Sequence, residues 1–587
     1  MMIATGLLGW SLLGTVAKAQ ETEFDFSGRF QNDLRFRILT NRDPVAPWWA
    51  PPEAPPDIIR NQNIVNTRMV AKNGRFRGVA DLDFVLEGYP LPFETLADLS
   101  DRRLHENIRI EADAMYFEGR DLLVKGLDLR LGQQIVQFGV GDQFNPTNNF
   151  NPNDVEDVLL FGDQQANIMA RLDYAIGPSW TATAVLVPVF KPSLIPITGP
   201  LALTELSRLP FQSDELRWRV HSEAQLGREA YGYPTVVGPV NIVLPEPTPG
   251  NMQFGFNLGG WVGMHDVAVS YYNGFADVPL ATATHTTQEI GEQCKGPKGR
   301  YCIDGLLVNE VTLEYPEIQV LGYNMAGEVN PLPFLKDFVP FGYRAEVAIV
   351  FPEKVRTTLT QDELQLGPIT QPAGEYDYGL ETPDGRRPVI LDNTPYPKWT
   401  LGLDYTLGKH VYINGQWVHG MLDEFGAGDN LFQQGFSVRD ARVTKLEDGC
   451  PYNVPFPGVD RSADDPKPGE QCVTEVLRAR QSDLAVIGLD INFASRSGLL
   501  RLFTITDLTG IEVEKWDEDA GERVRTRYSG FQRRGYSQVL YPELSWNFGN
   551  GLNMAGGALI QLGKKYTKFG DPAAGGSFVY SRAIYSF

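Results

Sequence analysis

The chain has 587 residues and a formal net charge of −21 at pH 7, with 59 Gly, 41 Pro, 23 Tyr and 32 Phe. So many turn formers and aromatic residues are not typical of an α-rich enzyme or of a disordered chain. The acidic balance excludes a nucleic-acid partner, because binding to phosphates needs a basic face, and four Cys in so long a chain exclude a disulfide scaffold.

The N-terminus carries a short apolar stretch over residues 3–16, followed by the small-x-small pattern of Ala17 and Ala19. This pattern predicts a signal peptide over residues 1–19 and a mature chain from Gln20, although no Lys or Arg precedes the apolar run. The alternative is a buried N-terminal helix. No later run of 18 apolar residues exists, so membrane-spanning helices are not expected.

From Glu23 to Ile38, polar and apolar residues alternate, which predicts a long β-strand with two different faces. The same alternation returns in six further segments: 75–87, 108–116, 127–135, 168–176, 341–351 and 540–548. We expect Phe30, Phe84, Leu129 and Trp546 on an outer apolar face.

Short and long connections take turns along the chain. Tight turns are expected at 73–74, 118–119, 177–178, 263–264, 408–409, 495–498 and 549–551, with a longer one at 330–337. Long polar connections are expected at 40–61, 88–104, 139–163, 190–250, 276–316, 353–396, 422–474, 511–533 and 563–577. This order predicts an all-β transmembrane antiparallel up-and-down β-barrel of about 18 strands (16 to 20) with long external loops.

The even strand number predicts a bacterial outer-membrane barrel with both termini in the periplasm, in contact with outer-membrane lipid and lipopolysaccharide. The chain ends with Tyr585-Ser586-Phe587 on an alternating segment. This ending resembles the recognition signal of bacterial outer-membrane barrels. The resemblance implies that Tyr585 and Phe587 form an assembly signal for the barrel-assembly machinery.

One stretch carries a family resemblance. Residues 130–139 read RLGQQIVQFG, and residues 151–155 read NPNDV. The two together resemble a family of proteobacterial outer-membrane proteins of unknown function, whose members carry R-x-G-R-Q, then W-G, then N-P-x-D-V. Gln133 stands where the family has Arg, and Phe138 where it has Trp. The same strand also resembles alginate-export-type barrels, and neither resemblance implies a substrate.

The connection over residues 139–163 combines several Asn-Pro and Asn-Asn turns with Asp154, Glu156 and Asp157. It directly follows a strand whose polar face carries Arg130 and Gln134. Such a loop can fold into the lumen and place an acidic constriction opposite the arginines. The alternative is an ordinary outward loop.

The sequence carries no motif for nucleophilic, phosphate-binding or zinc chemistry, so we expect no enzyme activity, no metal and no cofactor. Residues 517–522 resemble half of a calcium loop, but Arg523 and Arg525 interrupt the twelve-residue spacing. A solvated acidic loop is the better interpretation, and divalent bridging to anionic outer-leaflet lipid is the alternative.

The four cysteines fall in two predicted external loops. Cys294 and Cys302 lie in one, and Cys450 and Cys472 lie in the other. The compartment is oxidising, so we expect two disulfides within the loops, with cross-loop pairing as the alternative.

An 18-strand barrel is wide enough to leave a lumen. The predicted lumen face mixes both signs, which is typical of a polar conduit whose charge rings select solutes. The expected pore-lining and constriction residues are Arg29, Arg35, Arg75, Arg77, Asp81, Asp83, Arg109, Glu111, Asp113, Asp128, Arg130, Gln134, Asp154, Glu156 and Asp157. A salt-bridged wall with a purely structural role is the alternative for these charges.

Three functions follow from this pattern. The first is a porin-like channel for passive passage of small polar solutes. The second is a barrel that anchors large external loops, which bind a ligand, a partner or a surface polymer. The third is a carrier for hydrophobic substrates, which needs an apolar lumen-facing set that the sequence does not show. The sequence leaves the oligomeric state open.

Overall fold

The computed structural model describes residues 22–39, 58–87, 108–141, 144–154, 162–194, 235–290, 305–330, 340–356, 358–366, 369–375, 389–391, 393–420, 438–441, 474–478, 483–517, 522–563, 567–570 and 577–587. The signal segment 1–19, Glu156, Asp157 and the four cysteines lie outside them. In the described part of the chain, no helix is long and apolar enough to cross a membrane.

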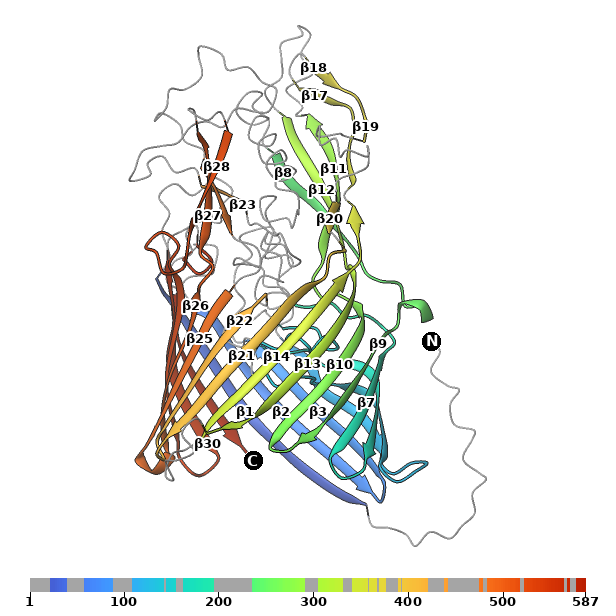
Figure 1. Ribbon diagram of the computed structural model, residues 1–587, viewed down its shortest axis with the longest axis vertical. Helices are drawn as coiled ribbons and strands as arrows, with labels where there is room; N and C mark the ends of the chain where they lie inside the picture. The colour runs from blue at the N-terminus through green and yellow to red at the C-terminus, as the bar shows by residue number, and fades with distance from the viewer. Residues whose placement is uncertain are drawn as a thin grey trace.

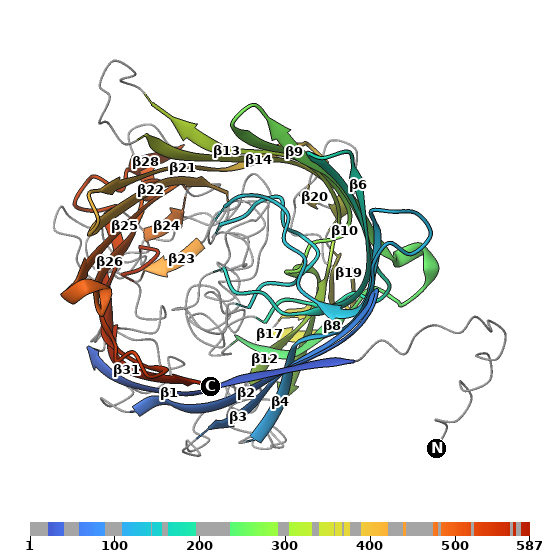
Figure 2. The same ribbon diagram turned by 90° about the horizontal axis from the view of Figure 1, so that it is seen from below.

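Eighteen antiparallel strands form one closed barrel (Figures 1 and 2). The strand number and the fold class agree with the prediction. The wall consists of β1 (Glu23–Leu39), β2 (Ile58–Asn73), β3 (Phe76–Glu87), β4 (Ile108–Gly119), β5 (Leu127–Gln134), β6 (Asn167–Ile176), β7 (Trp180–Val187), β9 (Gln253–Val262), β10 (His265–Phe275), β13 (Glu317–Val329), β14 (Phe341–Pro352), β21 (Tyr396–Leu407), β22 (Val411–His419), β25 (Asp483–Phe493), β26 (Gly498–Asp507), β29 (Ser537–Asn547), β30 (Leu552–Gly563) and β31 (Ser577–Ser586).

The barrel closes between its first and last strands. β1 pairs with β2 on one side and with β31 on the other. Gly28 and Phe587 exchange two backbone hydrogen bonds of 3.0 Å. A Cβ atom on Gly28 would lie 2.7 Å from the Phe587 ring, so only glycine admits this ring at the seam. Because the sheet has no open edge, its backbone groups are paired inside the wall.

The two ends of the barrel differ, and we call them the short-turn rim and the long-connection rim. The short-turn rim holds the tight turns, for example at Gly177 and Gly263, which both have positive φ. One predicted turn was misplaced. β4 continues through Glu118 and Gly119, and the turn occupies residues 120–126.

Side-chain alternation gives the wall an apolar outer face. Each of the 18 strands places a large apolar side chain on this face with substantial exposure: Phe30, Met69, Phe84, Ile110, Leu131, Leu172, Leu186, Phe256, Val269, Leu321, Ile349, Leu401, Ile413, Ile487, Leu502, Leu544, Met554 and Tyr585. Trp546 is exposed as expected, whereas Leu129 is half-buried. A continuous apolar exterior of this kind fits the hydrocarbon core of a bilayer.

One bulge changes the phase of the alternation. Asp81 pairs with Ala114 and Leu82 pairs with Ala112, which leaves Asp113 as the extra residue of β4. A bulge of this type turns the following residues of its strand by one position. Arg109 and Glu111 before it therefore share the inner face with Tyr116 and Glu118 after it.

The outer face offers a direct test of the register. Replacing Leu321, an exposed residue near the middle of β13, by Arg should destabilise the barrel by about 2–4 kcal/mol. Urea unfolding of the refolded protein in lipid vesicles would measure this. Leu321→Met is the control and should change little. An arginine without cost at this position would mean that Leu321 faces the lumen.

Several connections at the long-connection rim contain strands of their own, which the sequence analysis treated as loops. One sheet has the order β19-β16-β11-β12-β8, and another joins β23, β24, β27 and β28. Figure 1 shows these two groups rising beyond the barrel on different sides of its mouth. Their bounds are β8 (Thr235–Val243), β11 (Leu280–Ile290), β12 (Gly305–Glu314), β16 (Thr358–Gln361), β19 (Gly374–Glu375), β23 (Val438–Ala441), β24 (Thr474–Arg478), β27 (Ile511–Asp517) and β28 (Glu522–Tyr528).

The remaining short elements complete this end of the molecule. Two small two-stranded sheets pair β15 (Val355–Arg356) with β20 (Val389–Leu391), and β17 (Leu364–Leu366) with β18 (Ile369–Gln371). Single turns of 3-10 helix occupy Pro249–Asn251 and Ala494–Arg496.

Candidate pore and its inserted loop

The connection between β5 and β6, residues 135–166, contacts the inner wall on the far side of the barrel; we call it the inserted loop. Figure 2 shows its teal trace inside the ring of strands. The structure describes 135–141, 144–154 and 162–166 of this segment. Three sets of contacts hold it: a buried carboxylate at its tip, asparagines at its base, and apolar clusters on the inner wall.

The tip of the inserted loop is held by one carboxylate. Glu346 of β14 is fully buried and accepts four hydrogen bonds. The backbone N–H groups of Val140 and Gly141 donate to Oε2 at 2.8 and 2.9 Å, and the N–H and hydroxyl of Thr147 donate to Oε1 at 2.9 and 2.8 Å. A carboxylate has about four acceptor positions, so this tip uses all of them.

The base of the inserted loop is held by asparagines of the NPND segment. Asn151 is buried, accepts from the Val136 N–H at 2.8 Å and donates to the carbonyls of Gln134 and Gln165 at 3.0 and 2.9 Å. It therefore ties the entry of the loop to its exit.

A second asparagine of this segment contacts the β10–β11 connection at the long-connection rim. Asn153 donates to the carboxylate of Asp277 through its backbone N–H at 3.0 Å and its side chain at 2.9 Å. Ser193 donates to the same carboxylate oxygen. These contacts give the motif a structural explanation, because its asparagines fix a loop that has few backbone partners.

An apolar cluster fastens the loop to the wall. Phe138 and Phe150 pack edge to face with ring centroids 5.0 Å apart, and Phe150 packs in the same way on Tyr272 of β10 at 5.2 Å. Glycines make the room for this contact. A Cβ atom on Gly255 of β9 would lie 2.5 Å from the Phe150 ring.

A second apolar cluster lies further round the inner wall. Phe144 of the inserted loop and Phe569 of the β30–β31 connection join wall residues that include Val418, Leu484 and Ile505. Part of the lumen face is thus apolar and buried, which corrects the expectation of a lumen without an apolar set. The sequence analysis missed it because the strongest alternation lies in the N-terminal third.

The remaining inner wall, from β31 through β1 to β6, is densely charged. A lateral row begins with Arg77 of β3, continues through Glu118 and Arg130, and ends with Arg171 of β6, each opposite the next across the strands. Glu118 contacts Arg77 at 3.6 Å, Arg120 at 3.1 Å and Arg130 at 3.6 Å. We call Arg77, Glu118, Arg130 and Arg171 the basic row.

Further toward the long-connection rim, carboxylates and arginines mix. Asn66 donates to Asp81 and Asp83 at 2.7 and 2.5 Å, and Arg29 lies 3.7 Å from Asp83. Arg109 contacts Glu87 at 3.0 Å and Glu111 at 2.6 Å.

At the seam, Asp33 contacts Arg35 at 2.6 Å and Arg582 at 3.5 Å. Many of these pairs cross from one strand to another, so they also hold the wall together.

The expected pore residues divide into three groups. Arg29, Arg35, Arg77, Asp81, Asp83, Arg109, Glu111, Asp128, Arg130 and Gln134 lie on the inner face by the strand register. Arg75 lies in the β2–β3 turn and donates to the Asp121 carbonyl at 3.0 Å, and Asp113 is the exposed bulge residue. The backbone N–H of Asp154 donates to the Asp163 carbonyl at 2.9 Å, whereas Glu156 and Asp157 lie outside the described residues.

Two central carboxylates were missed by sequence reasoning. Glu118 looked like a turn residue because Gly119 follows it. Glu346 is the only charged residue between Ala345 and Phe351, and this isolated acid in an apolar strand was the available signal.

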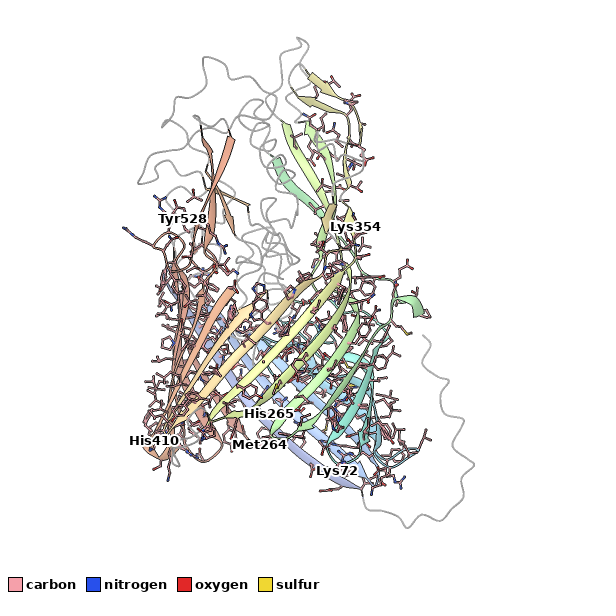
Figure 3. All side chains as sticks on the ribbon, viewed as in Figure 1. Lys72, Met264, His265, Lys354, His410 and Tyr528 are labelled. Carbon is pink, nitrogen blue, oxygen red and sulfur yellow. The ribbon has the colours of Figure 1, made fainter. Side chains whose placement is uncertain are left out.

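In the part of the chain that the structure describes, no group of His, Cys, Asp and Glu side chains could hold a metal ion. Figure 3 shows His265 and His410 near the short-turn rim, with Lys354 and Tyr528 at the opposite end. His419 lies at the other end of β22 from His410. Its Nδ1 atom is 2.9 Å from a carboxylate oxygen of Asp483.

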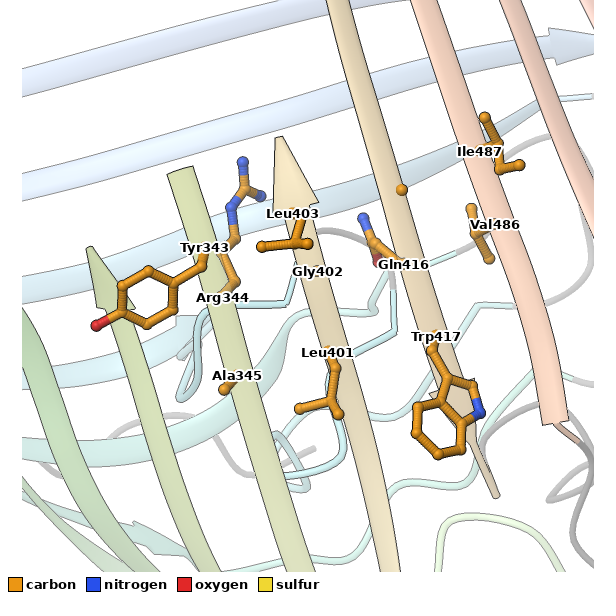
Figure 4. A pocket seen from close by; sticks show the side chains of 11 residues that line it. Tyr343, Arg344, Ala345, Leu401, Gly402, Leu403, Gln416, Trp417, Val486 and Ile487 are labelled. Atoms are coloured by element: carbon orange, nitrogen blue, oxygen red, sulfur yellow. The ribbon is translucent and has the colours of Figure 1, made fainter. Parts of the chain in front are cut away.

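A shallow groove of about 490 Å³ lies on the outer wall (Figure 4). Tyr343, Leu401, Leu403, Trp417 and Ile487 form its sides, and a Cβ atom on Gly415 would meet nothing within 4 Å. Its apolar lining belongs to the lipid-facing surface, separate from the lumen.

No family model matches the chain, and no curated protein matches it. Among solved structures, it is similar to OccK5 (OpdH) of Pseudomonas aeruginosa, with 8% identity, 96% of this chain and 97% of that chain covered, and a TM-score of 0.38. OccAB3 of Acinetobacter baumannii is also similar, with 9% identity, 96% of this chain and 99% of that chain covered, and a TM-score of 0.39. OccK11 (OpdR) of Pseudomonas aeruginosa has 7% identity, 96% of each chain covered, and a TM-score of 0.40.

Proposed function

We propose that the protein is a porin-like channel of the bacterial outer membrane for passive passage of small polar solutes. One observation carries the proposal: charged side chains on the inner wall keep contact with water. Arg29 and Arg68 are 44% and 49% exposed, and their nearest carboxylates, Asp83 and Asp81, lie 3.7 and 3.8 Å away. A dry interior would bury these groups or pair them fully, whereas an aqueous passage leaves them solvated.

The inserted loop supplies the narrowing that a selective pore needs. Its described residues contact the inner wall at the tip and are tied together at the base, and the backbone N–H of Asp154 donates to the Asp163 carbonyl. We propose that Asp154, Glu156 and Asp157 line the constriction. Pore-facing carboxylates in a confined space attract cations.

Single-channel recording in a planar bilayer tests the proposal. The purified full chain should give discrete conductance steps in KCl. Neutralising Asp154, Glu156 and Asp157 together to Asn, Gln and Asn should lower the preference for K⁺ over Cl⁻, measured by the zero-current potential. The matched control is Asp490→Asn, because Asp490 faces the lumen but is already bound by Arg501 at 2.8 Å through two contacts. Absence of conductance would contradict the channel function.

The second candidate is a barrel that anchors a binding surface. It is favoured by the two sheets that extend beyond the long-connection rim, which are ordered elements rather than simple loops. Replacing residues 279–313 by a short Gly-Ser linker removes β11 and β12 and leaves the wall strands intact. Under this candidate, the deletion abolishes binding of cells to a surface polymer while conductance is absent in both proteins. Under the channel function, conductance remains.

The remaining expectations belong to the same proposal. Passive passage needs neither a cofactor nor an enzymatic reaction. The apolar outer face implies contact with outer-membrane lipid and lipopolysaccharide. Folding implies the barrel-assembly machinery, with Tyr585 and Phe587 as its signal, and both termini at the periplasmic side.

A further inference from the structure

Three guanidinium groups surround the carboxylate of Glu118: those of Arg77 and Arg130 from the basic row, and that of the adjacent Arg120. Glu118 is only 5% exposed, and both of its oxygens are occupied: Oε1 by Arg120 and Arg130, and Oε2 by Arg77. Arg120 makes the closest contact, through Nε at 3.1 Å and Nη2 at 3.5 Å. Arg77 and Arg130 are held only at 3.6 Å, beyond the usual length of a charged hydrogen bond.

Arg77 and Arg130 therefore keep donors for another acceptor. The Nε atoms of both arginines are buried and make no hydrogen bond in the described structure, so a solute can reach only the Nη groups, which carry four of the five N–H donors of each guanidinium. Their side chains are 24% and 23% exposed, so the guanidinium groups reach the lumen from a fixed base.

The position of Arg130 is set in advance. Its guanidinium lies over the Tyr116 ring with Cζ 4.8 Å from the ring centroid. Glu118 fixes the same guanidinium from the neighbouring side. A group held in this way loses little conformational entropy when a ligand arrives.

The neighbours of Arg130 leave the row short of one acceptor. Arg171 stands directly opposite Arg130, and like charges in this position destabilise a sheet. Asp173 forms an ion pair with Arg171 at 2.8 Å, and Asp128 accepts a hydrogen bond from the backbone N–H of Asp121 at 2.9 Å. The wall carboxylates near the row are thus engaged by groups other than the two loosely held arginines.

We infer that Arg77 and Arg130 form an anion station for the carboxylate group of small organic acids, inside the channel near its short-turn rim. This inference rests on the proposed function and names one solute class for it. A planar carboxylate matches the planar fork of arginine, whereas chloride offers no second acceptor. Binding is weak, because Glu118 competes for both arginines, and weak binding is what passage requires.

Zero-current potentials in potassium acetate and potassium chloride gradients test the station. We expect the wild-type permeability ratio of acetate to chloride to fall about ten-fold in the double variant R77Q/R130Q, the loss typical of a charged hydrogen bond. Arg130→Lys keeps the charge and removes the planar fork, so it should lower the ratio without changing the preference for K⁺. Arg501→Gln is the control for each single change, Arg77→Gln or Arg130→Gln, because it removes one charge from an arginine that already makes two hydrogen bonds to Asp490.

A second measurement separates the station from the channel. Saturation-transfer NMR of acetate on the full chain in detergent should give a signal that R77Q/R130Q loses and Arg501→Gln keeps, whether or not the protein conducts. An equal signal in all three proteins overturns the station. If inorganic phosphate competes as strongly as acetate, the site is a general oxyanion site and carboxylate preference is wrong. If the double variant loses heat-modifiability, it has not folded. The test then uses Arg130→Lys, which retains the ion pair with Glu118.

Discussion

Replacing Glu346 by Ala should release the tip of the inserted loop and raise the single-channel conductance. The side chain is fully buried and accepts four hydrogen bonds from Val140, Gly141 and Thr147. Removing it leaves these neutral donors without an acceptor in the interior, and each unsatisfied donor costs about 1–3 kcal/mol. The lumen then widens where Val140, Gly141 and Thr147 leave β14, whereas the Phe144 carbonyl keeps its 2.8 Å hydrogen bond from Thr400.

Glu346→Gln separates charge from shape in the same position. An amide NH₂ would face two donors of the loop, so this variant should also release the tip despite its nearly equal volume. Glu543→Gln is the control, because Glu543 accepts from Tyr580 at 2.6 Å and contacts wall strands rather than the loop. Unfolding curves in urea and single-channel recording give the two readouts. Wild-type conductance in Glu346→Ala would show that the tip stays in place without the carboxylate.

The fold was predictable because the bilayer imposes a strong pattern on the sequence. Lipid outside and water inside force alternation along each wall strand, and one rim with short turns fixes the strand count. Phe30 lies on the outer face and Asp83 on the inner face, as the alternation along their strands predicts. The strands β8, β11 and β12 lie beyond the bilayer, where this pressure ends, and they were not predicted.

The site was predictable only in part, for reasons of distance in the chain. Arg77 and Arg130 follow from local alternation on single strands. The Glu346 contacts join groups separated by 206, 205 and 199 residues, and no local pattern connects an acid in β14 with backbone N–H groups of a distant loop. Glu118 was missed because a following glycine is typical of a turn, whereas here Gly119 still belongs to β4.

The basic row and the loop acids have different consequences for selectivity. Asp154 of the inserted loop lies toward the long-connection rim, since it forms a bridge with Leu194 and its neighbour Asn153 binds Asp277. The basic row lies near the opposite rim, beside the turn at 120–126. Under the proposed channel function, a solute would meet Asp154 and the basic row one after the other. Neutralising either one should alter selectivity without abolishing conductance.

Replacing Phe150 by Ala should destabilise the barrel by about 3–5 kcal/mol and raise conductance, because Phe150 joins the inserted loop to the wall through Phe138 and Tyr272. The cavity arises beside Gly255, whose backbone cannot move inward to fill it, since it is paired with Val185 and Tyr272. Urea unfolding and single-channel recording measure both effects.

The double variant E346A/F150A decides whether tip and base hold one common element. If each single change releases the same loop, the conductance of the double variant should equal that of the more open single variant. The stability loss of the double variant should then be smaller than the sum of the two single losses. Val79→Ala is the control, because Val79 of β3 is buried outside both apolar clusters; paired with F150A, it should give additive losses. Additive conductance changes in E346A/F150A would instead mean that tip and base move separately, and the constriction would then consist of two independent segments.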